Sequence, residues 1–344
     1  MNSATASVVR PEPEGFRPQP FKDRMSDHSL RRHLRREARA ERAFRTATFL
    51  SAILVLALLA GVIIALVDGA WPALKAFRWS FVTQEKWNPV TDIYGAAGPL
   101  YGTVISSIIA LVIAVPISFG IAVFLTEVCP RWLRGPISTG IELLASIPSI
   151  VYGIWGLFVL APILQHDIQP WLIAHLGSLP LVGKLFQGPP FGIGLFTAGV
   201  VLAIMILPFI SSVMREVFRV APHSLKEAAY GLGATRWNVV WDVVLPWSKT
   251  GVVGGIMLGL GRAMGETMAV TFVIGNVHRI SASLLAPSTT ISAAIANEFA
   301  EAVGDLYTSS LFALGLLLFV LTFVVIASAR LMLLHLDRGA VKRA

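Results

Sequence analysis

The chain has 344 residues, of which 55% are hydrophobic and 14% are charged. Because soluble domains average about 25% charged residues, this composition excludes an ordinary water-soluble globular protein and favours a chain that lies largely in lipid. The net charge of +8 could indicate a nucleic-acid-binding protein, but basic residues beside membrane spans set topology instead. We therefore expect a lipid membrane and no nucleic acid as the chain's surroundings.

The first 45 residues form a basic segment. Residues 1–28 are polar and proline-containing, which is typical of disorder. Residues 29–45 hold seven arginines, with apolar side chains at i+4 spacing. This pattern fits a helix lying on anionic headgroups, although a plain positive anchor for the first span is the simpler interpretation. We expect residues 1–45 to be a cytoplasmic, largely disordered extension.

Six apolar stretches follow, and each is long enough to cross a hydrocarbon core, which takes roughly 20 residues of helix. They lie at about 46–67, 101–125, 136–161, 193–213, 251–275 and 311–331. Since only helices satisfy their own backbone in lipid at such lengths, the sequence predicts an all-α polytopic membrane protein. Its six-helix transmembrane domain spans 46–335, and a short cytoplasmic tail covers 336–344.

The basic residues of the loops fall unequally on the two sides of these spans. With the N-terminus inside, 22 loop lysines and arginines lie on the cytoplasmic side and five lie outside. This asymmetry predicts that both termini are cytoplasmic.

The cytoplasmic loop over about 214–250 carries a spaced motif. Its specified positions are Glu227, Ala228, Ala229, Gly233, Val243, Leu245 and Pro246. The spacing is similar to the EAA loop of ABC importer permeases, EAA-x3-G-x9-I-x-L-P, with valine in place of isoleucine. The resemblance implies that these residues couple the chain to a separate ATPase.

The physical properties of this loop favour the same interpretation. Ser224 is placed to cap a short helix, with Glu227 closing a capping box. Gly233 permits a left-handed helix end, and small Ala228 and Ala229 allow close contact with a groove in another protein. An ordinary amphipathic surface loop is the alternative. No P-loop accompanies the motif, because the nearest match, around Lys184, has the wrong glycine spacing; we expect the ATPase to be another chain.

The fifth apolar stretch contains two charges near its middle. Arg262 and Glu266 are four residues apart, which places them on one face of a continuous helix. Each charge costs about 2.5–3.5 kcal/mol on insertion scales, so such residues face protein or water and usually mark a substrate path. Because a guanidinium matches oxyanion geometry, an anionic substrate is indicated. The alternative is a neutral pair that only packs the bundle.

Two further features belong to this interpretation. Gly251, Gly255 and Gly259 repeat at i+4, a spacing that lets helix backbones approach closely. Glu142, in the third stretch, is a weaker pathway candidate because it lies near the cytoplasmic start of its span and could be solvated there. The single cysteine and scattered histidines show no metal-ligand spacing, and we expect neither metal nor cofactor.

Longer segments extend the resemblance to a more specific family. The runs GRAMGETMAVTFVIGN, SIPSIVYGIWGLFVLAP and TTISAAIANEFAEA resemble the PstC-type permease family of phosphate-specific ABC transporters over roughly residues 46–335. The likeness implies the six-span MetI-like fold in an inner membrane, with no enzymatic activity of its own. It also implies three kinds of partner: a second homologous permease, a dimer of cytoplasmic ATPase subunits and an external phosphate-binding protein. Phosphate passage is the implied role of Arg262 and Glu266.

Three other functions stay open on the sequence alone. A permease of the same architecture could carry another oxyanion, such as phosphonate or sulfate. An ATP-independent secondary transporter or channel would explain the spans and the buried charges but not the docking motif. A membrane-embedded enzyme would need clustered catalytic groups, and only Arg262, Glu266 and Glu142 are available.

Overall fold

The computed structural model describes residues 27–180 and 182–341. In this part of the chain all regular structure is helical, apart from two isolated β-bridges, so the predicted all-α class is confirmed. Disorder is predicted for residues 1–28, of which residues 1–26 lie outside the described part of the chain. Residues 27–45 are helical and belong to α1.

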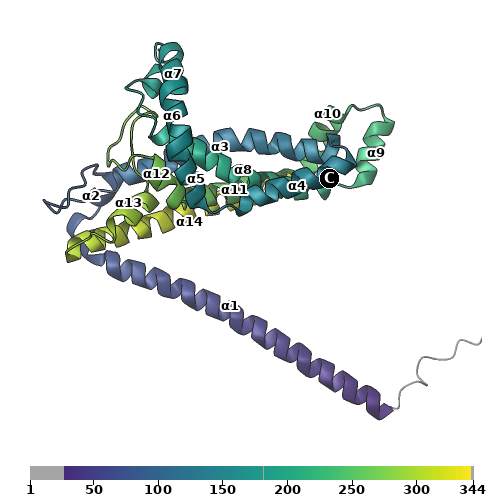
Figure 1. Cartoon of the computed structure of the whole chain (residues 1–344). Coiled ribbons are helices and arrows are strands. Elements are labelled where there is room, and N and C mark those ends of the chain that lie inside the picture. The colour runs from purple at the N-terminus through teal and green to yellow at the C-terminus, as the bar shows by residue number, and fades with distance from the viewer. Residues whose placement is uncertain (1–26, 181, 342–344) are drawn as a thin grey trace, which may run out of the picture. The chain divides into compact units, whose positions relative to one another are not determined.

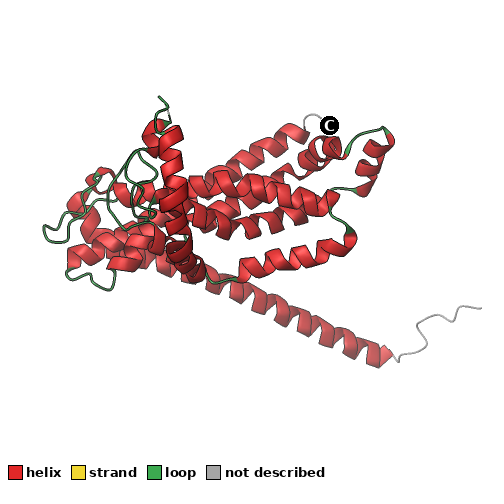
Figure 2. Ribbon diagram, turned by 45° about the horizontal axis from the view of Figure 1, so that its top comes forward, coloured by secondary structure: helices red, strands yellow, loops and turns green. Residues whose placement is uncertain are grey.

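The helices follow one another along the chain as Figures 1 and 2 show. The α-helices are α1 Asp27–Phe77, α2 Ser80–Thr83, α3 Ala97–Val123, α4 Arg131–Ser146, α5 Ser149–Trp155, α6 Ala161–Ile163, α7 Gln169–Leu176, α8 Leu195–Arg219, α9 His223–Gly231, α10 Arg236–Asn238, α11 Leu245–Met264, α12 Met268–Val273, α13 Ile291–Glu298 and α14 Asp305–Val341. The π-helical turns are η2 Phe124–Val128, η3 Gly156–Leu160, η4 Leu164–Ile168 and η6 Val239–Val244, and η5 Gly183–Phe186 is a 3₁₀ turn.

The chain divides into two units, Met1–Val62 and Ile63–Ala344. The structure describes the helical residues 27–62 of the first unit, and the second contains the other helices. In the second unit α3, α4, α8, α11 and α14 run side by side as a bundle, with α9 and α10 at one end and α2 and α13 at the other (Figures 1 and 2).

Six helical segments are long and apolar enough to cross a membrane, which agrees with the predicted number. They are Glu37–Phe77, Ala97–Val128, Ser149–Leu176, Leu195–Arg219, Arg236–Met264 and Asp305–Leu331. Four of them overlap the predicted stretches closely, whereas the third and fifth differ because a helix breaks inside the apolar run.

The third predicted span, 136–161, is wrong as a single helix. α4 ends at Ser146, and Ile147 has an extended backbone with φ −65° and ψ 129° before Pro148. A residue that precedes proline is driven out of the helical region by contact with the proline ring, which explains the break. Beyond it, the segment from α5 to α7 runs steeply across the direction of α3 and α8 (Figure 1).

α3 and α8 pack along each other and form the centre of the bundle. A Cβ on Gly199 would lie 2.4 Å from the side chain of Ile109, so only glycine permits this approach of the two backbones. Further along, the Ser118 hydroxyl donates to the carbonyl of Leu207 at 3.1 Å. Because a hydroxyl buried in an apolar bundle needs a partner, this bond also fixes the register between the two helices.

The predicted glycine face of α11 is confirmed, and it packs against α8. A Cβ on Gly251 would lie 2.4 Å from the side chain of Val217, and one on Gly259 would lie 2.6 Å from that of Ile210. Gly255 makes the same kind of approach between them, at 2.9 Å. Glycines at this spacing let two backbones meet along their length, which sets the position of every other residue on α11.

At the opposite end of the bundle from α9, an ionisable cluster ties four segments together. The Glu298 carboxylate accepts hydrogen bonds from Trp87 Nε1 at 2.6 Å and Tyr307 Oη at 2.8 Å, and it pairs with His278 Nε2 at 2.7 Å. Burial by itself raises the pKa of Glu298, but these bonds outweigh burial and lower it. Burial and the nearby Asp92 raise the pKa of Tyr94, which stacks on Tyr307, to about 12.

The glycine contact between α11 and α8 predicts opposite effects for two neighbouring glycines. In Gly251→Ala the new methyl meets the stiff, β-branched Val217, so we expect a lower thermal midpoint and reduced yield, equivalent to about 1–3 kcal/mol of overpacking. In Gly254→Ala nothing lies within 4 Å of the added Cβ, and the helix should gain about 0.5–1 kcal/mol. Thermal unfolding of both variants in detergent checks this, and equal effects would contradict the contact.

Candidate functional site

Arg262 lies near the middle of the bundle, and its side chain is exposed. The contacts of α11 place Gly259 opposite Ile210 of α8, so Arg262 lies about one turn further on, level with the central residues of Leu195–Arg219. Its guanidinium is exposed on the surface of this chain. A charge at that depth faces protein or water and rarely lipid. Because no ion pair of Arg262 occurs among the residues that the structure describes, this face of α11 is expected to meet a polar neighbour or water.

The prediction that Arg262 and Glu266 share one helix face is wrong. α11 ends at Met264, and the next helix, α12, begins at Met268 after a short break. The Glu266 carboxylate accepts a hydrogen bond from the backbone N–H of Ala269 at 3.2 Å, which satisfies a donor that the first turn of α12 would otherwise leave open. Among the described residues Arg262 and Glu266 form no ion pair with each other, so each carries its charge separately.

Glu142 lies at a different level from these two residues. Its carboxylate accepts from the Arg215 guanidinium at 2.8 Å, and the side chain of Arg215 is only 7% exposed whereas that of Glu142 is 57% exposed. Gly251 and Gly255 of α11 face Val217 and Val213 of α8, so Arg215 is level with the residues of α11 about nine positions before Arg262. At the rise of an α-helix, this separates the two arginines by roughly 13 Å along the bundle. The structure therefore brings Glu142 to Arg215 and away from the predicted pathway pair.

Arg215 was missed because the predicted fourth span stopped at residue 213. α8 continues to Arg219, with Met214 and Phe218 fully buried. The apolar residues at i and i+4 beyond position 213 were the signal that could have extended the helix. A buried arginine this close to the end of a span is a second charge that the bundle must accommodate.

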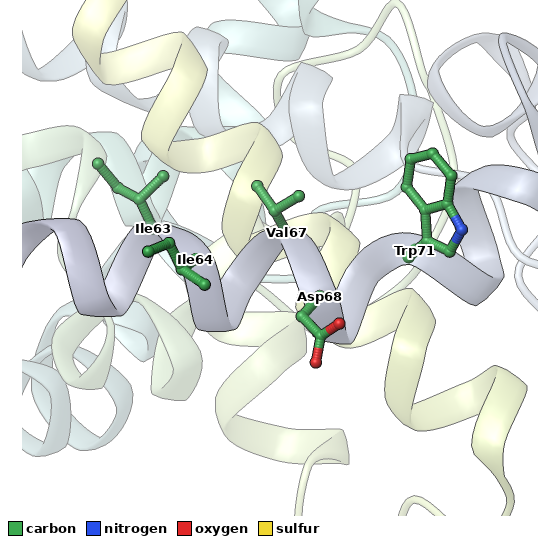
Figure 3. A pocket seen from close by; sticks show the side chains of 5 residues that line it. All are labelled: Ile63, Ile64, Val67, Asp68 and Trp71. Atoms are coloured by element: carbon green, nitrogen blue, oxygen red, sulfur yellow. The ribbon is translucent and has the colours of Figure 1, made fainter.

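A hollow on the outer surface of α1 does not contain the predicted site. Figure 3 shows its lining, in which the carboxylate of Asp68 lies among apolar side chains of the same helix. The lining residues are Ile63, Ile64, Val67, Asp68 and Trp71. Arg262, Glu266 and Glu142 are absent from it, so the hollow does not help to locate a substrate path.

The predicted coupling motif forms a short helix with a left-handed end. α9 covers His223–Gly231, and Gly233 has φ +85° as expected. The N–H of Ala234 bonds to the carbonyl of Ala229 and that of Gly233 bonds to Tyr230, which is the Schellman pattern. The predicted capping box is wrong, because Pro222 occupies the N-cap position and Ser224 lies inside the helix.

The motif residues divide between an outer and an inner surface. Glu227 and Ala228 are exposed, whereas Ala229 and Leu245 are half-buried and pack against the core of the bundle. Pro246 is the second residue of α11, directly after the π-helical turn η6. The inner residues therefore hold the loop on the membrane helices, and the outer ones present a small, acidic surface to whatever docks there.

Comparison with known proteins identifies the family. A family model described as "binding-protein-dependent transport system inner membrane component" matches residues 114–339. The "phosphate transport system permease protein PstC" of Mesorhizobium japonicum is 61% identical over 304 residues, which cover 88% of this chain and 93% of that protein. The protein of the same name from Pasteurella multocida is 59% identical and covers 87% and 93%. The chain belongs to the PstC family.

A solved structure with a similar chain is an inward-facing conformation of the MetNI methionine ABC transporter. It is 19% identical, covers 70% of this chain and 94% of that chain, and has a TM-score of 0.48. A bacterial ABC transporter involved in alginate import is 17% identical, with coverages of 82% and 95% and a TM-score of 0.48.

Membership of the PstC family and the six membrane-length helices together indicate where the chain is located. The chain is a multi-pass inner-membrane permease of a binding-protein-dependent transport system, and it is a transport subunit and not an enzyme. In this PstC-family chain the exposed mid-bundle arginine and the α9 loop are the two features whose chemistry fits transport.

Proposed function

We propose that this chain is the permease subunit of an ATP-driven importer of inorganic phosphate. The observation that carries the proposal is the exposed guanidinium of Arg262 at mid-bundle depth, in a chain 61% identical to a protein named as a phosphate transport system permease. An arginine offers two parallel donors that match a phosphate oxyanion. In a pathway between two permeases it would be neither in lipid nor buried without a partner.

In this proposal Arg262 binds the passing anion and Glu266 keeps it from being trapped. Arg262 lies in the last turn of α11 and Glu266 in the break that follows it, and no ion pair joins the two in the part of the chain that the structure describes. A carboxylate near a bound phosphate repels it, and conduction requires a site weak enough to leave. Glu142 lies beside Arg215, nearer to the α9 end of the bundle. We propose it as a pathway residue on the cytoplasmic side, where its exposed carboxylate would discourage the return of phosphate.

Each proposed partner is assigned to a surface that is exposed in this chain. A second, homologous permease would cover the face of α11 that carries Arg262. A dimer of ATPase subunits would dock on α9, where Glu227, Ala228 and the 91%-exposed Leu232 form an open surface suited to helix-in-groove contact. An external phosphate-binding protein would deliver the substrate at the opposite end of the bundle.

The proposed topology places both termini and α9 in the cytoplasm, with residues 1–45 as the extension, 46–335 as the permease domain and 336–344 as the tail. The basic residues of the loops support this orientation. α14 also ends at the end of the bundle that carries α9 and α10 (Figures 1 and 2).

The role of Arg262 is tested by substitution in the assembled transporter. Arg262→Gln should reduce ATP-dependent phosphate uptake by about 100-fold, because two charge-assisted hydrogen bonds are lost, while the complex still assembles. Arg262→Lys should recover part of the uptake, since an ammonium keeps the charge but loses the planar fork. Glu266→Gln should instead slow phosphate release. Uptake into proteoliposomes and bound phosphate, measured side by side, distinguish these effects.

A matched change, Arg279→Gln, removes an exposed arginine from the loop between α12 and α13 and should leave uptake unchanged. Normal uptake by Arg262→Gln would contradict the pathway role. If the unsubstituted complex took up another oxyanion and not phosphate, phosphate would be wrong as the proposed substrate. If it took up phosphate without ATP, the proposal of an ATP-driven importer would be wrong.

The docking role of α9 depends on its left-handed end. In Gly233→Val the side chain meets no neighbour within the chain, but the residue must keep φ +85°, which costs about 1–2 kcal/mol for a non-glycine residue. We expect the helix end to unwind and the ATPase to be lost on purification. Gly231→Ala, also in open space but with ordinary φ, should retain it. A full complement of ATPase with normal stimulated hydrolysis in Gly233→Val would argue against docking at α9.

A further inference from the structure

One lysine of α9 faces the membrane helices and is largely covered by them. Lys226 lies next to the exposed Glu227, yet its own side chain is only 11% exposed. Its Nζ donates to Oε1 of Glu127 at 2.6 Å, and the side chain of Glu127 is 8% exposed. Among the ion pairs of the described residues, this is the one that joins α9 to the helices of the bundle.

A buried ion pair of this kind fixes geometry more than it adds stability. Removing two charges from water carries a penalty that their attraction offsets only in good geometry, so an apolar pair would hold a static loop at least as well. A short charged contact has a defined distance and direction. The pair therefore suits a contact that must keep its register while its two ends move together.

The Glu127 end of the pair is itself held rigidly. Glu127 lies in η2, the π-helical turn that closes α3. The guanidinium of Arg134, from α4, donates to the carbonyls of Thr126 at 3.2 Å and Cys129 at 3.3 Å. The residues on both sides of Glu127 are thus fixed to the start of the next helix, and a force on its carboxylate acts on the end of α3 instead of bending the turn.

From the end of α3 a continuous set of close contacts leads to Arg262. α3 meets α8 through Gly199 against Ile109 and through the bond from Ser118 to Leu207. α8 meets α11 at the three glycine contacts, of which Gly259 is the last before Arg262. Packed interiors resist local deformation, so these helices are expected to move as connected bodies.

We propose that the Lys226–Glu127 pair is the positioning contact that converts a displacement of α9 into movement of the α3–α8–α11 core. This proposal rests on the proposed function, because it requires an ATPase that displaces α9. Lys226 and Glu127 are positioning residues in it and touch neither substrate nor nucleotide.

The test uses the complete transporter, with both permeases, the ATPase subunits and the binding protein, in proteoliposomes. Three measurements are made on each variant: the amount of ATPase that co-purifies, ATP hydrolysis, and phosphate taken up per ATP hydrolysed. In Lys226→Met and Glu127→Gln the outer face of α9 is unchanged, so the ATPase should stay bound. Hydrolysis should continue, and uptake per ATP should fall at least tenfold.

Two double variants separate positioning from stability. The exchanged pair, Glu127→Lys with Lys226→Glu, restores an ion pair, so uptake per ATP should return to within about threefold of the unsubstituted transporter. The neutral pair, Glu127→Gln with Lys226→Met, leaves no charge stranded, so thermal stability should recover while uptake per ATP stays low. If a single variant does not assemble, the neutral pair still distinguishes a positioning role from a structural one. Lys86→Met, which removes an exposed lysine from the segment between α2 and α3, is the control for loss of one positive charge.

Recovery of both stability and uptake per ATP in the neutral pair would overturn the proposal, since the contact would then be structural alone. Single variants with unchanged uptake per ATP would overturn it as well. Failure of the unsubstituted transporter to take up phosphate with ATP is a separate outcome, which contradicts the proposed function. Normal transport by the unsubstituted complex and by every variant contradicts only the positioning role.

Discussion

The close contact between α8 and α11 is the constraint on which the rest of the structure depends. Three glycines spaced four residues apart leave room for Val217, Val213 and Ile210 of α8, and a Cβ at any of them would lie closer than atoms can approach. Lipid gives no hydrophobic reason for two helices to associate, so close packing of this kind supplies the attraction. It also fixes the depth of α11, and with it the position of Arg262.

The charges of the bundle are arranged in two different ways that follow from this packing. Arg215 is buried and Lys226 is largely covered, and each has a carboxylate within 2.8 Å, as expected where an unpaired charge would be costly. Arg262 is exposed at mid-bundle depth, and the described residues place no carboxylate in such a pair with it. In the first arrangement each buried charge is compensated within the chain, whereas in the second a charge at this depth needs a polar surface or water beside it. Membership of the family implies ABC transporter partners, and in the proposed function one of them supplies that polar surface.

Local sequence patterns predicted those features that depend on neighbouring residues. The glycine spacing of α11, the left-handed Gly233 and the number of membrane-length helices all follow from short-range geometry. The break after Met264 was missed because the apolar run continues through it, and the carboxylate that stabilises the new helix start, Glu266, had been read as a member of a continuous face.

Other features could not be read from the sequence because they join distant segments. Glu142 and Arg215 are 73 residues apart, and Glu127 and Lys226 are 99 apart, so no periodicity relates them. Pairing of this kind is decided by which helices pack together. The break at Pro148 was visible in principle, because the residue before a proline avoids the helical region, but hydropathy outweighed it in the choice of the third span.

The aqueous surroundings proposed for Arg262 can be measured directly by thiol labelling. In a Cys129→Ser background, a single cysteine at position 262 is compared with one at Ile117, an exposed apolar residue next to Ser118 and so at about the same depth on α3. In the assembled transporter a charged, membrane-impermeant thiol reagent should react with the cysteine at position 262 and not with the one at position 117. Equal resistance of both positions to that reagent, with both labelled only by a lipid-soluble one, would place Arg262 in lipid and contradict the account.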